Sequence, residues 1–286
     1  MSNQKGQKAL VSGFSKKTKV ERIAWISEQF NNSQQATALL ETYTHPDTKR
    51  QSLHDDFIEN AITNFYLPLG VAPNVIINGK TLTIPMAIEE SSVVAAAANA
   101  AKFWATKGGF QARILGTEKV GQVHFIFDGN PNTLQTFFST HKTILLQSTD
   151  SITKNMRARG GGITSLKLLD KTTLLDGYFQ LDVRFDTKDS MGANFINSCL
   201  EQLAKTLLEL AAQYADFLEN EKAIEVVMSI LSNHVPNCLV EASVSYPVAE
   251  LLTNVAESEL FAEKFVQAVL IAEVEPYRAV THNKGI

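Results

Sequence analysis

The amino-acid sequence predicts a mixed α+β protein, in which stretches of helical periodicity alternate with short strand-like runs. Three observations support this prediction. Residues 18–42 and about 55–65 place apolar side chains at helical spacing. Residues 75–86 place β-branched residues on both sides of an Asn-Gly pair, the pattern of a β-hairpin. From residue 110 the chain changes to a series of short strands and helices, which predicts a second structural module.

The first part of the chain, to about residue 109, is expected to hold helices and the hairpin. Residues 67–73 (Leu-Pro-Leu-Gly-Val-Ala-Pro) predict a rigid, turn-rich connector. The hairpin is followed by Glu89-Glu90-Ser91-Ser92 and an alanine-rich helix to about Thr106. Serine is a good N-cap for this helix, and the two glycines at 108–109 are a good stop.

The second module, residues 110–220, is expected to be a compact α+β unit, and the remainder to add one strand and one long helix. Expected strands are 111–115, 121–127, 163–169, 178–186 and 239–245, and expected helices are 131–148, 192–218 and 258–272.

Composition excludes several classes of protein. The chain has 286 residues, 44% of them hydrophobic, enough for one large domain or two modest ones. A net charge of −4 and scattered Lys and Arg argue against nucleic-acid binding. The longest apolar run, 93–105, is interrupted by polar residues and too short for a membrane span, and no signal peptide is expected. Cys199 and Cys238 are expected to be reduced thiols of a cytoplasmic protein, and the histidines show no metal-binding spacing, so no metal site is expected.

Two segments could bind anions. The turn Asp186–Asn194 follows an alternating strand and opens a long helix, an arrangement suited to a pyrophosphate. An ordinary Asp or Ser cap followed by glycine explains this turn equally well. Arg157 and Arg159 stand beside three glycines, which allow close approach of a phosphate. A mobile loop with solvated arginines is at least as common an explanation.

Two further segments could supply catalytic groups. Glu89-Glu90 precede a helix N-terminus, which favours anions, and spacing alone favours this structural role. A catalytic acid at this place would need burial to remain protonated. The run Arg278 to Lys284 is densely polar, and its lysine could stabilise an oxyanion. The alternative is a basic helix C-terminus. His234 is expected to be a structural histidine.

Taken together, these stretches resemble those of the class II hydroxymethylglutaryl-CoA (HMG-CoA) reductases of bacteria. The resemblance covers nearly the whole chain, and its segments occur in the family's order. They are Glu59–Ile62, Leu67–Val71, Pro85–Ala97, Arg159–Gly162, Asp186–Asn194, Ile230–Asn233 and Tyr277–Ile286.

The resemblance implies a large acyl-CoA-binding domain with an inserted small α+β dinucleotide-binding domain. The large domain would comprise residues 1–109 and 221–286, the small one residues 110–220, and the C-terminal part of the large domain would be absent from the chain. The family's working unit is a homodimer or an oligomer built from dimers. Glu59 and Asn60 match its dimer-associated motif.

The implied reaction is the four-electron reduction of HMG-CoA to mevalonate and CoA, or its reverse. Glu90 matches the catalytic proton donor and Lys284 the lysine that stabilises the oxyanion. The positions that match substrate contacts are Ser92, Arg278 and Asn283, and those that match cofactor contacts are Asp189, Met191, Gly192, Asn194, Arg159 and Gly161. NADPH is favoured over NADH because residues 163–165 offer no acid for the ribose hydroxyl.

The sequence departs from the family pattern in two ways. Ser91 stands where the family usually has proline, and Ala98 where it often has serine. The family's catalytic aspartate and histidine lie beyond the position of Lys284, so the chain alone is expected to be inactive. Two alternatives remain: a non-catalytic dimerising or ligand-binding remnant of the same fold, and a different acyl-CoA or aldehyde reductase.

Overall fold

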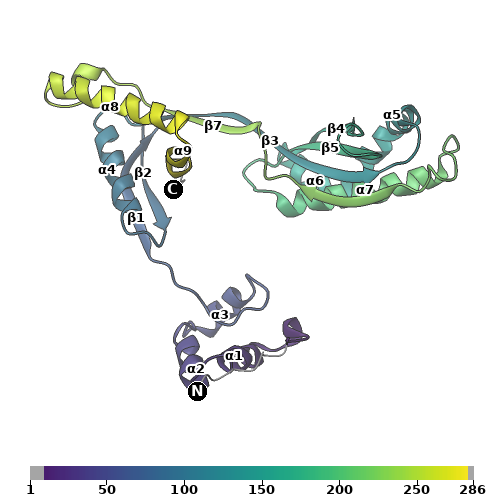
Figure 1. Cartoon of the computed structure of the whole chain (residues 1–286), viewed down its shortest axis with the longest axis horizontal. Helices are drawn as coiled ribbons and strands as arrows, with labels where there is room; N and C mark the ends of the chain where they lie inside the picture. Colours follow the sequence, from purple (N-terminus) through teal and green to yellow (C-terminus); the bar gives the residue numbers. More distant parts are fainter. Residues whose placement is uncertain (1–9, 283–286) are drawn as a thin grey trace. The chain divides into compact units, whose positions relative to one another are not determined.

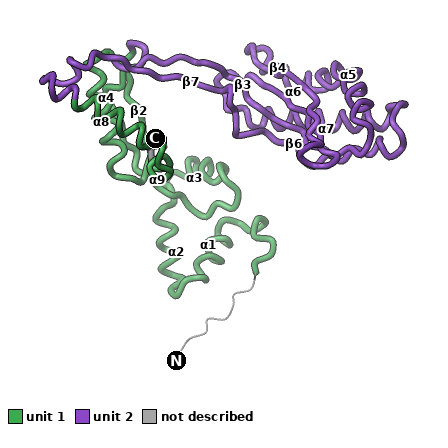
Figure 2. Tube along the Cα trace, turned by 45° about the horizontal axis from the view of Figure 1, so that its top comes forward, with its two compact units in different colours: residues 1–76, 80–108, 260–286 green, residues 77–79, 109–259 purple. Residues whose placement is uncertain are grey.

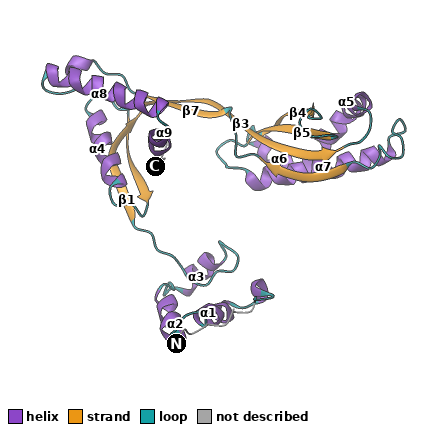
Figure 3. Ribbon diagram, viewed as in Figure 1, coloured by secondary structure: helices purple, strands orange, loops and turns teal. Residues whose placement is uncertain are grey.

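The computed structural model describes residues 10–282 of the chain (Figure 1). The fold divides into two compact units (Figure 2): unit 1 is formed by residues 1–76, 80–108 and 260–286, and unit 2 by residues 77–79 and 109–259. Helices and strands alternate along the chain (Figure 3), so the predicted α+β class is confirmed.

Unit 1 begins with three short helices, and the first two of them replace the single helical stretch predicted over 18–42. That prediction is wrong at residues 28–32, where Asn32 is extended and its side chain accepts a hydrogen bond from the Gln35 amide to start a new helix. Thr18 and Glu21 form a capping box at the first helix. After a 3₁₀ turn at Phe14–Lys16, the helices are α1 (Lys19–Ser27), α2 (Ser33–Thr42) and α3 (Thr48–Asp55).

The predicted helix at about 55–65 is wrong. Its place in the order is taken by α3, which starts early because the Asp47 carboxylate caps the Lys49 and Arg50 amides. Residues 56–68 are irregular, and Asn60 has a left-handed φ of 59°, which ends any helical path.

The predicted hairpin is confirmed, with β1 (Leu69–Ile77) and β2 (Lys80–Ala87) as its strands. Asn78 and Gly79 have φ of 50° and 75°, as the tight turn requires. The predicted connector over 67–73 is wrong from Leu69 onward, because that segment is already strand. The predicted alanine-rich helix is confirmed as α4 (Val93–Ala105).

Unit 2 contains a five-stranded sheet in the order β4-β5-β3-β6, with β7 pairing on β3. The strands are β3 (Gln111–Ile126), β4 (Gly162–Asp170), β5 (Tyr178–Asp186), β6 (Glu225–Leu231) and β7 (Cys238–Ser243). The two strands predicted within 111–127 are one continuous strand. Its first half pairs with β7 and its second half with β5 and β6, so no turn separates them.

Three helices cover one face of this sheet: α5 (Pro131–Ser148), α6 (Asp150–Ala158) and α7 (Ala193–Gln213). The core lies between the layers. Phe179, Leu181, Val183 and Phe185 alternate along β5, are almost fully buried, and belong to one cluster with side chains of α5 and α7. The unpredicted α6 follows α5 after a single residue, and α7 ends five residues earlier than expected.

The chain continues through a 3₁₀ turn at Val248–Glu250 into α8 (Val255–Val274) and α9 (Pro276–His282). The polar run that begins at Arg278 is therefore helical as far as it is described. None of the helices between residues 10 and 282 has the length and apolar character needed to cross a membrane.

Candidate functional site

The turn between β5 and α7 has the geometry of an anion-binding loop. Thr187 and Ser190 close it through their hydroxyls: Thr187 Oγ1 donates to the Ser190 carbonyl at 2.7 Å, and Ser190 Oγ donates to the Thr187 carbonyl at 2.8 Å. Gly192 is the N-cap of α7, with a left-handed φ of 77°. A Cβ at Gly192 would lie 2.5 Å from Thr187 Cγ2, so only glycine fits.

No side chain caps α7. Within the described part of the chain, the backbone N–H groups of Met191 to Phe195 find no acceptor. The alternative of an ordinary Asp or Ser cap is therefore wrong, since Asp189 and Ser190 leave these donors open. A run of unsatisfied amides at a helix N-terminus attracts an anion through both hydrogen bonding and the helix dipole.

The glycine loop lies against the start of this turn. Gly162 pairs with Asp186 in the β4–β5 ladder. A Cβ on Gly161 would come 2.4 Å from the Asp186 carbonyl oxygen, and one on Gly160 would touch the Lys188 side chain at 3.5 Å. The two predicted phosphate-binding segments are thus brought together, although they are separated along the sequence.

Charges around the turn are unevenly paired. Lys188 donates to Asp186 through its amide at 2.8 Å and its ammonium at 2.9 Å, and these bonds hold the pKa of Asp186 below its ordinary 3.8. Arg157 pairs with Asp150 at 3.0 Å. Arg159 is exposed, and the one polar contact of its side chain among the described residues is with the Met156 sulfur at 3.6 Å.

Two further parts of unit 2 complete the site: Lys119, which the sequence did not single out, and the segment Ile230–Asn233, which belongs to the family resemblance. Lys119, on β3, donates to the Ser190 and Met191 carbonyls at 2.8 Å each. The end of β6 is hydrogen-bonded to α7 through Asn197, whose side-chain oxygen accepts from the Leu231 amide at 3.0 Å. A cavity of about 270 Å³ lies between these parts, lined by Lys119, Met191, Ala193, Ile196, Leu231, Ser232, Asn233 and Val235.

The expected catalytic segment lies in unit 1. Glu90 and Ser92 are both exposed just before α4. Ser92 occupies the N-cap position, but its side chain makes no capping hydrogen bond. Arg278 is exposed on α9, and its amide donates to Glu275. Asn283 and Lys284 lie outside the described residues.

His234, expected to be structural, is exposed, and its amide donates to Ser232 Oγ at 3.0 Å. Among the described residues, no cluster of His, Cys, Asp and Glu could hold a metal ion.

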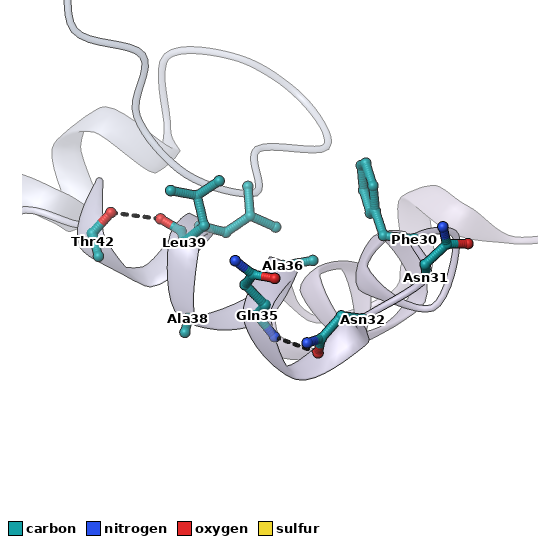
Figure 4. Close-up of a pocket in the computed structure, with 9 residues that line it drawn as sticks. Phe30, Asn31, Asn32, Gln35, Ala36, Ala38, Leu39 and Thr42 are labelled. Atoms are coloured by element: carbon teal, nitrogen blue, oxygen red, sulfur yellow. Dashed lines mark hydrogen bonds between the residues drawn. The ribbon is translucent and has the colours of Figure 1, made fainter.

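A second hollow, of about 670 Å³, runs beside α2 (Figure 4). It contains none of the expected site residues and no ionisable side chain, so it offers no acid, base or charge for catalysis. Its lining consists of Phe30, Asn31, Asn32, Gln35, Ala36, Ala38, Leu39, Leu40 and Thr42.

Residues 18–286 match the model of the hydroxymethylglutaryl-coenzyme A reductase family, and the chain belongs to this family. A solved class II HMG-CoA reductase from Streptococcus pneumoniae, bound to NADPH in open conformations, is similar, with a TM-score of 0.71 and 32% identity. That match covers 95% of this chain and 69% of the other.

Two curated relatives of this chain are also HMG-CoA reductases by name. A 3-hydroxy-3-methylglutaryl-coenzyme A reductase of Archaeoglobus fulgidus is 33% identical over 232 residues, which cover 81% of this chain and 50% of the relative. A probable 3-hydroxy-3-methylglutaryl-coenzyme A reductase of Borreliella burgdorferi is 32% identical over 247 residues, which cover 85% of this chain and 53% of the relative. The chain thus spans about half the length of the curated relatives it matches.

Proposed function

We propose that this chain acts in an HMG-CoA reductase that binds NADPH at the β5–α7 turn and reduces HMG-CoA to mevalonate and CoA. The observation that carries the proposal is the run of open amides from Met191 to Phe195, located in the turn that resembles the family's dinucleotide-binding segment. Family membership supports it, as does the similar S. pneumoniae enzyme bound to NADPH.

The described residues fit a dinucleotide. Glycines at 161 and 192 allow the loop and the turn to pack tightly, because a Cβ at either position would collide with Asp186 or Thr187, and this packing fixes the shape of the turn that carries the open amides. We assign the cofactor contacts to Asp189, Met191, Gly192, Asn194, Arg159 and Gly161. Arg159, exposed and without an ion pair among the described residues, suits the additional phosphate that distinguishes NADPH from NADH.

When bound, NADPH would supply hydride to the thioester carbonyl, with two NADPH oxidised for each mevalonate formed, and the chain's own residues would stabilise the negative charge that develops. Negative charge develops on the carbonyl oxygen, and we assign Lys284 to offset it and Glu90 to donate a proton toward it. Ser92, Arg278 and Asn283 are assigned to hold the substrate. Glu90 is exposed in the single chain. The burial that its acid role requires would therefore come with substrate or a second subunit.

A homodimer is also proposed, with the active site at the subunit interface. Its support is the apolar surface of unit 1. Helix α8 carries apolar side chains on more than one face, which is typical of a helix that is covered on all sides. Yet Phe265, Val266 and Ile271 are each more than half exposed. Light scattering on the purified chain should give the mass of a dimer, and a monomer at all concentrations would contradict this.

We propose the cytoplasm as the compartment of this protein, since both cysteines are free thiols.

The test of cofactor binding is a fluorescence titration with NADPH. Gly192→Ala adds a Cβ 2.5 Å from Thr187 and should weaken binding at least about tenfold. Gly79→Ala is the matched control: its φ of 75° is almost the same, but no atom lies within 4 Å of the added Cβ. Its affinity should stay within about twofold. No binding by the wild-type chain, or equal binding by Gly192→Ala, would contradict the proposal.

Turnover distinguishes the enzyme from the non-catalytic remnant. A preparation that oxidises NADPH only when HMG-CoA is present, and loses this activity in Lys284→Ala, supports the enzyme. NADPH binding without turnover, in a preparation that contains the full coding region, favours the remnant. Substrate-dependent oxidation with another acyl-CoA or an aldehyde, but not with HMG-CoA, would point to the other reductase.

A further inference from the structure

Lys119 occupies an unusual position in unit 2. It lies on β3 directly opposite Phe185 of β5, one residue before the β5–α7 turn begins. Its half-buried side chain extends to the turn, where the ammonium donates to two consecutive carbonyl oxygens, those of Ser190 and Met191. No carboxylate lies within ion-pairing distance of this ammonium in the part of the chain that the structure describes.

The neighbouring acids are directed elsewhere. Glu118 contacts Arg184 at 3.5 Å and accepts from the Asn237 side chain at 2.9 Å. Asp186 is held by Lys188 at 2.9 Å. The positive charge of Lys119 therefore lies beside the turn, and neither Glu118 nor Asp186 neutralises it.

The two hydrogen bonds fix the direction of the open amides. In a trans peptide, the C=O and the following N–H point in opposite directions, and the described chain contains no cis peptide. Because the Ser190 and Met191 carbonyls face Lys119, the N–H groups of Met191 and Gly192 face the opposite side. Thr187 reinforces this, since its hydroxyl also donates to the Ser190 carbonyl.

We propose that Lys119 is a positioning residue of the dinucleotide site: it orients the Met191 and Gly192 amides toward the diphosphate and adds positive charge behind them. The proposal rests on the proposed function, because it assumes that the anion at this turn is the diphosphate of NADPH. It adds a residue that no feature of the sequence had singled out.

The test compares Lys119→Met with Lys167→Met in the full 286-residue chain. Lys167 is exposed on β4 of the same sheet, so its substitution makes the same charge change away from the turn. NADPH affinity should fall about tenfold or more in Lys119→Met, which is about 1.4 kcal/mol, and stay within about twofold in Lys167→Met. NADH should lose affinity by the same factor as NADPH, because both carry the diphosphate.

A fragment without the diphosphate separates positioning from a general structural effect. The probe is 2′-AMP, used as a competitor of NADPH. Lys119→Met should leave its affinity within about twofold, because the loss is specific to the diphosphate. Equal losses for 2′-AMP and NADPH would show a merely structural role and overturn the proposal.

Two other variants guard against a folding defect. Lys119→Arg keeps the cation and should retain NADPH affinity within about threefold, whereas Lys119→Gln keeps a neutral donor and should show the loss. Wild-type affinity in Lys119→Gln or Lys119→Met overturns the proposal while leaving NADPH binding itself intact. A wild-type chain that fails to bind NADPH overturns the proposed function as well, so the two failures are distinguishable.

Discussion

Gly161→Ala tests the contact that joins the glycine loop to the β5–α7 turn. The added Cβ would lie 2.4 Å from the Asp186 carbonyl oxygen, whereas ordinary contacts begin near 3.4 Å. The loop and the strand end must therefore separate by about 1 Å, and a backbone oxygen cannot rotate away. Overpacking of this kind costs about 1–3 kcal/mol, and the backbone collision favours the upper half of that range.

The expected result is a lower melting temperature of unit 2. At about 2–4 °C per kcal/mol for a unit of this size, 2–3 kcal/mol corresponds to a fall of about 4–12 °C. Thermal melts followed by far-UV circular dichroism measure this fall in melting temperature. Trp25 and Trp104 lie in unit 1, so their fluorescence is an internal reference for the part of the chain that the substitution does not touch.

Gly79→Ala again serves as the control, because it introduces backbone strain without a collision and should cost about 1 kcal/mol. A melting temperature of Gly161→Ala within 1 °C of the wild type, or no lower than that of the control, would show that the loop does not lie against Asp186.

Two further predictions follow from the electrostatics. The pKa of Asp186 is depressed by hydrogen bonds from Lys188, so its ionised form stabilises the fold above pH 4, and this stabilisation is lost as the pH falls through the lowered pKa. In urea titrations, the stability of Asp186→Asn should therefore fall less steeply than that of the wild type as the pH drops below about 4. An equal loss of stability in the two proteins would contradict the ion pair. Burial raises the pKa of Cys199 to about 12, so native protein at pH 8 should be alkylated by iodoacetamide at the half-buried Cys238 and spared at Cys199; mass spectrometry showing equal labelling would contradict this.

Local chemistry explains what the sequence predicted well. The Asn-Gly pair at 78–79 specifies its turn through two residues that tolerate positive φ, so the hairpin follows from the sequence alone. Strand β5 is also predicted by a local pattern, because its alternate apolar side chains from Phe179 to Phe185 all face the buried side of the sheet.

Pairing between segments far apart in the sequence explains most of the features that the sequence did not predict. The single strand β3 depends on β7, where Arg113 pairs with Glu241 more than one hundred residues later. A local sequence pattern cannot show that partner. The false helix over 55–65 is amphipathic, but local side-chain bonds override the pattern: Asp47 starts α3 early, and Asn60 adopts a left-handed conformation.

For the candidate site too, local sequence predicted some parts, and only the fold shows the others. The glycine loop and the β5–α7 turn were each recognisable as phosphate-binding segments, but only the Gly162–Asp186 pairing brings them together. Lys119 gave no signal, because a lysine within a strand belongs to no motif. Its role follows from the 2.8 Å contacts that the fold creates.

An amide NMR titration of the isotopically labelled chain with NADPH would locate the dinucleotide site directly. The amide resonances of Met191 to Phe195 should shift most, together with those of the glycine loop at 160–162. Saturable shifts confined to other segments, such as the β1–β2 hairpin or the hollow beside α2, with the Met191–Phe195 amides unmoved, would contradict a dinucleotide site at the β5–α7 turn.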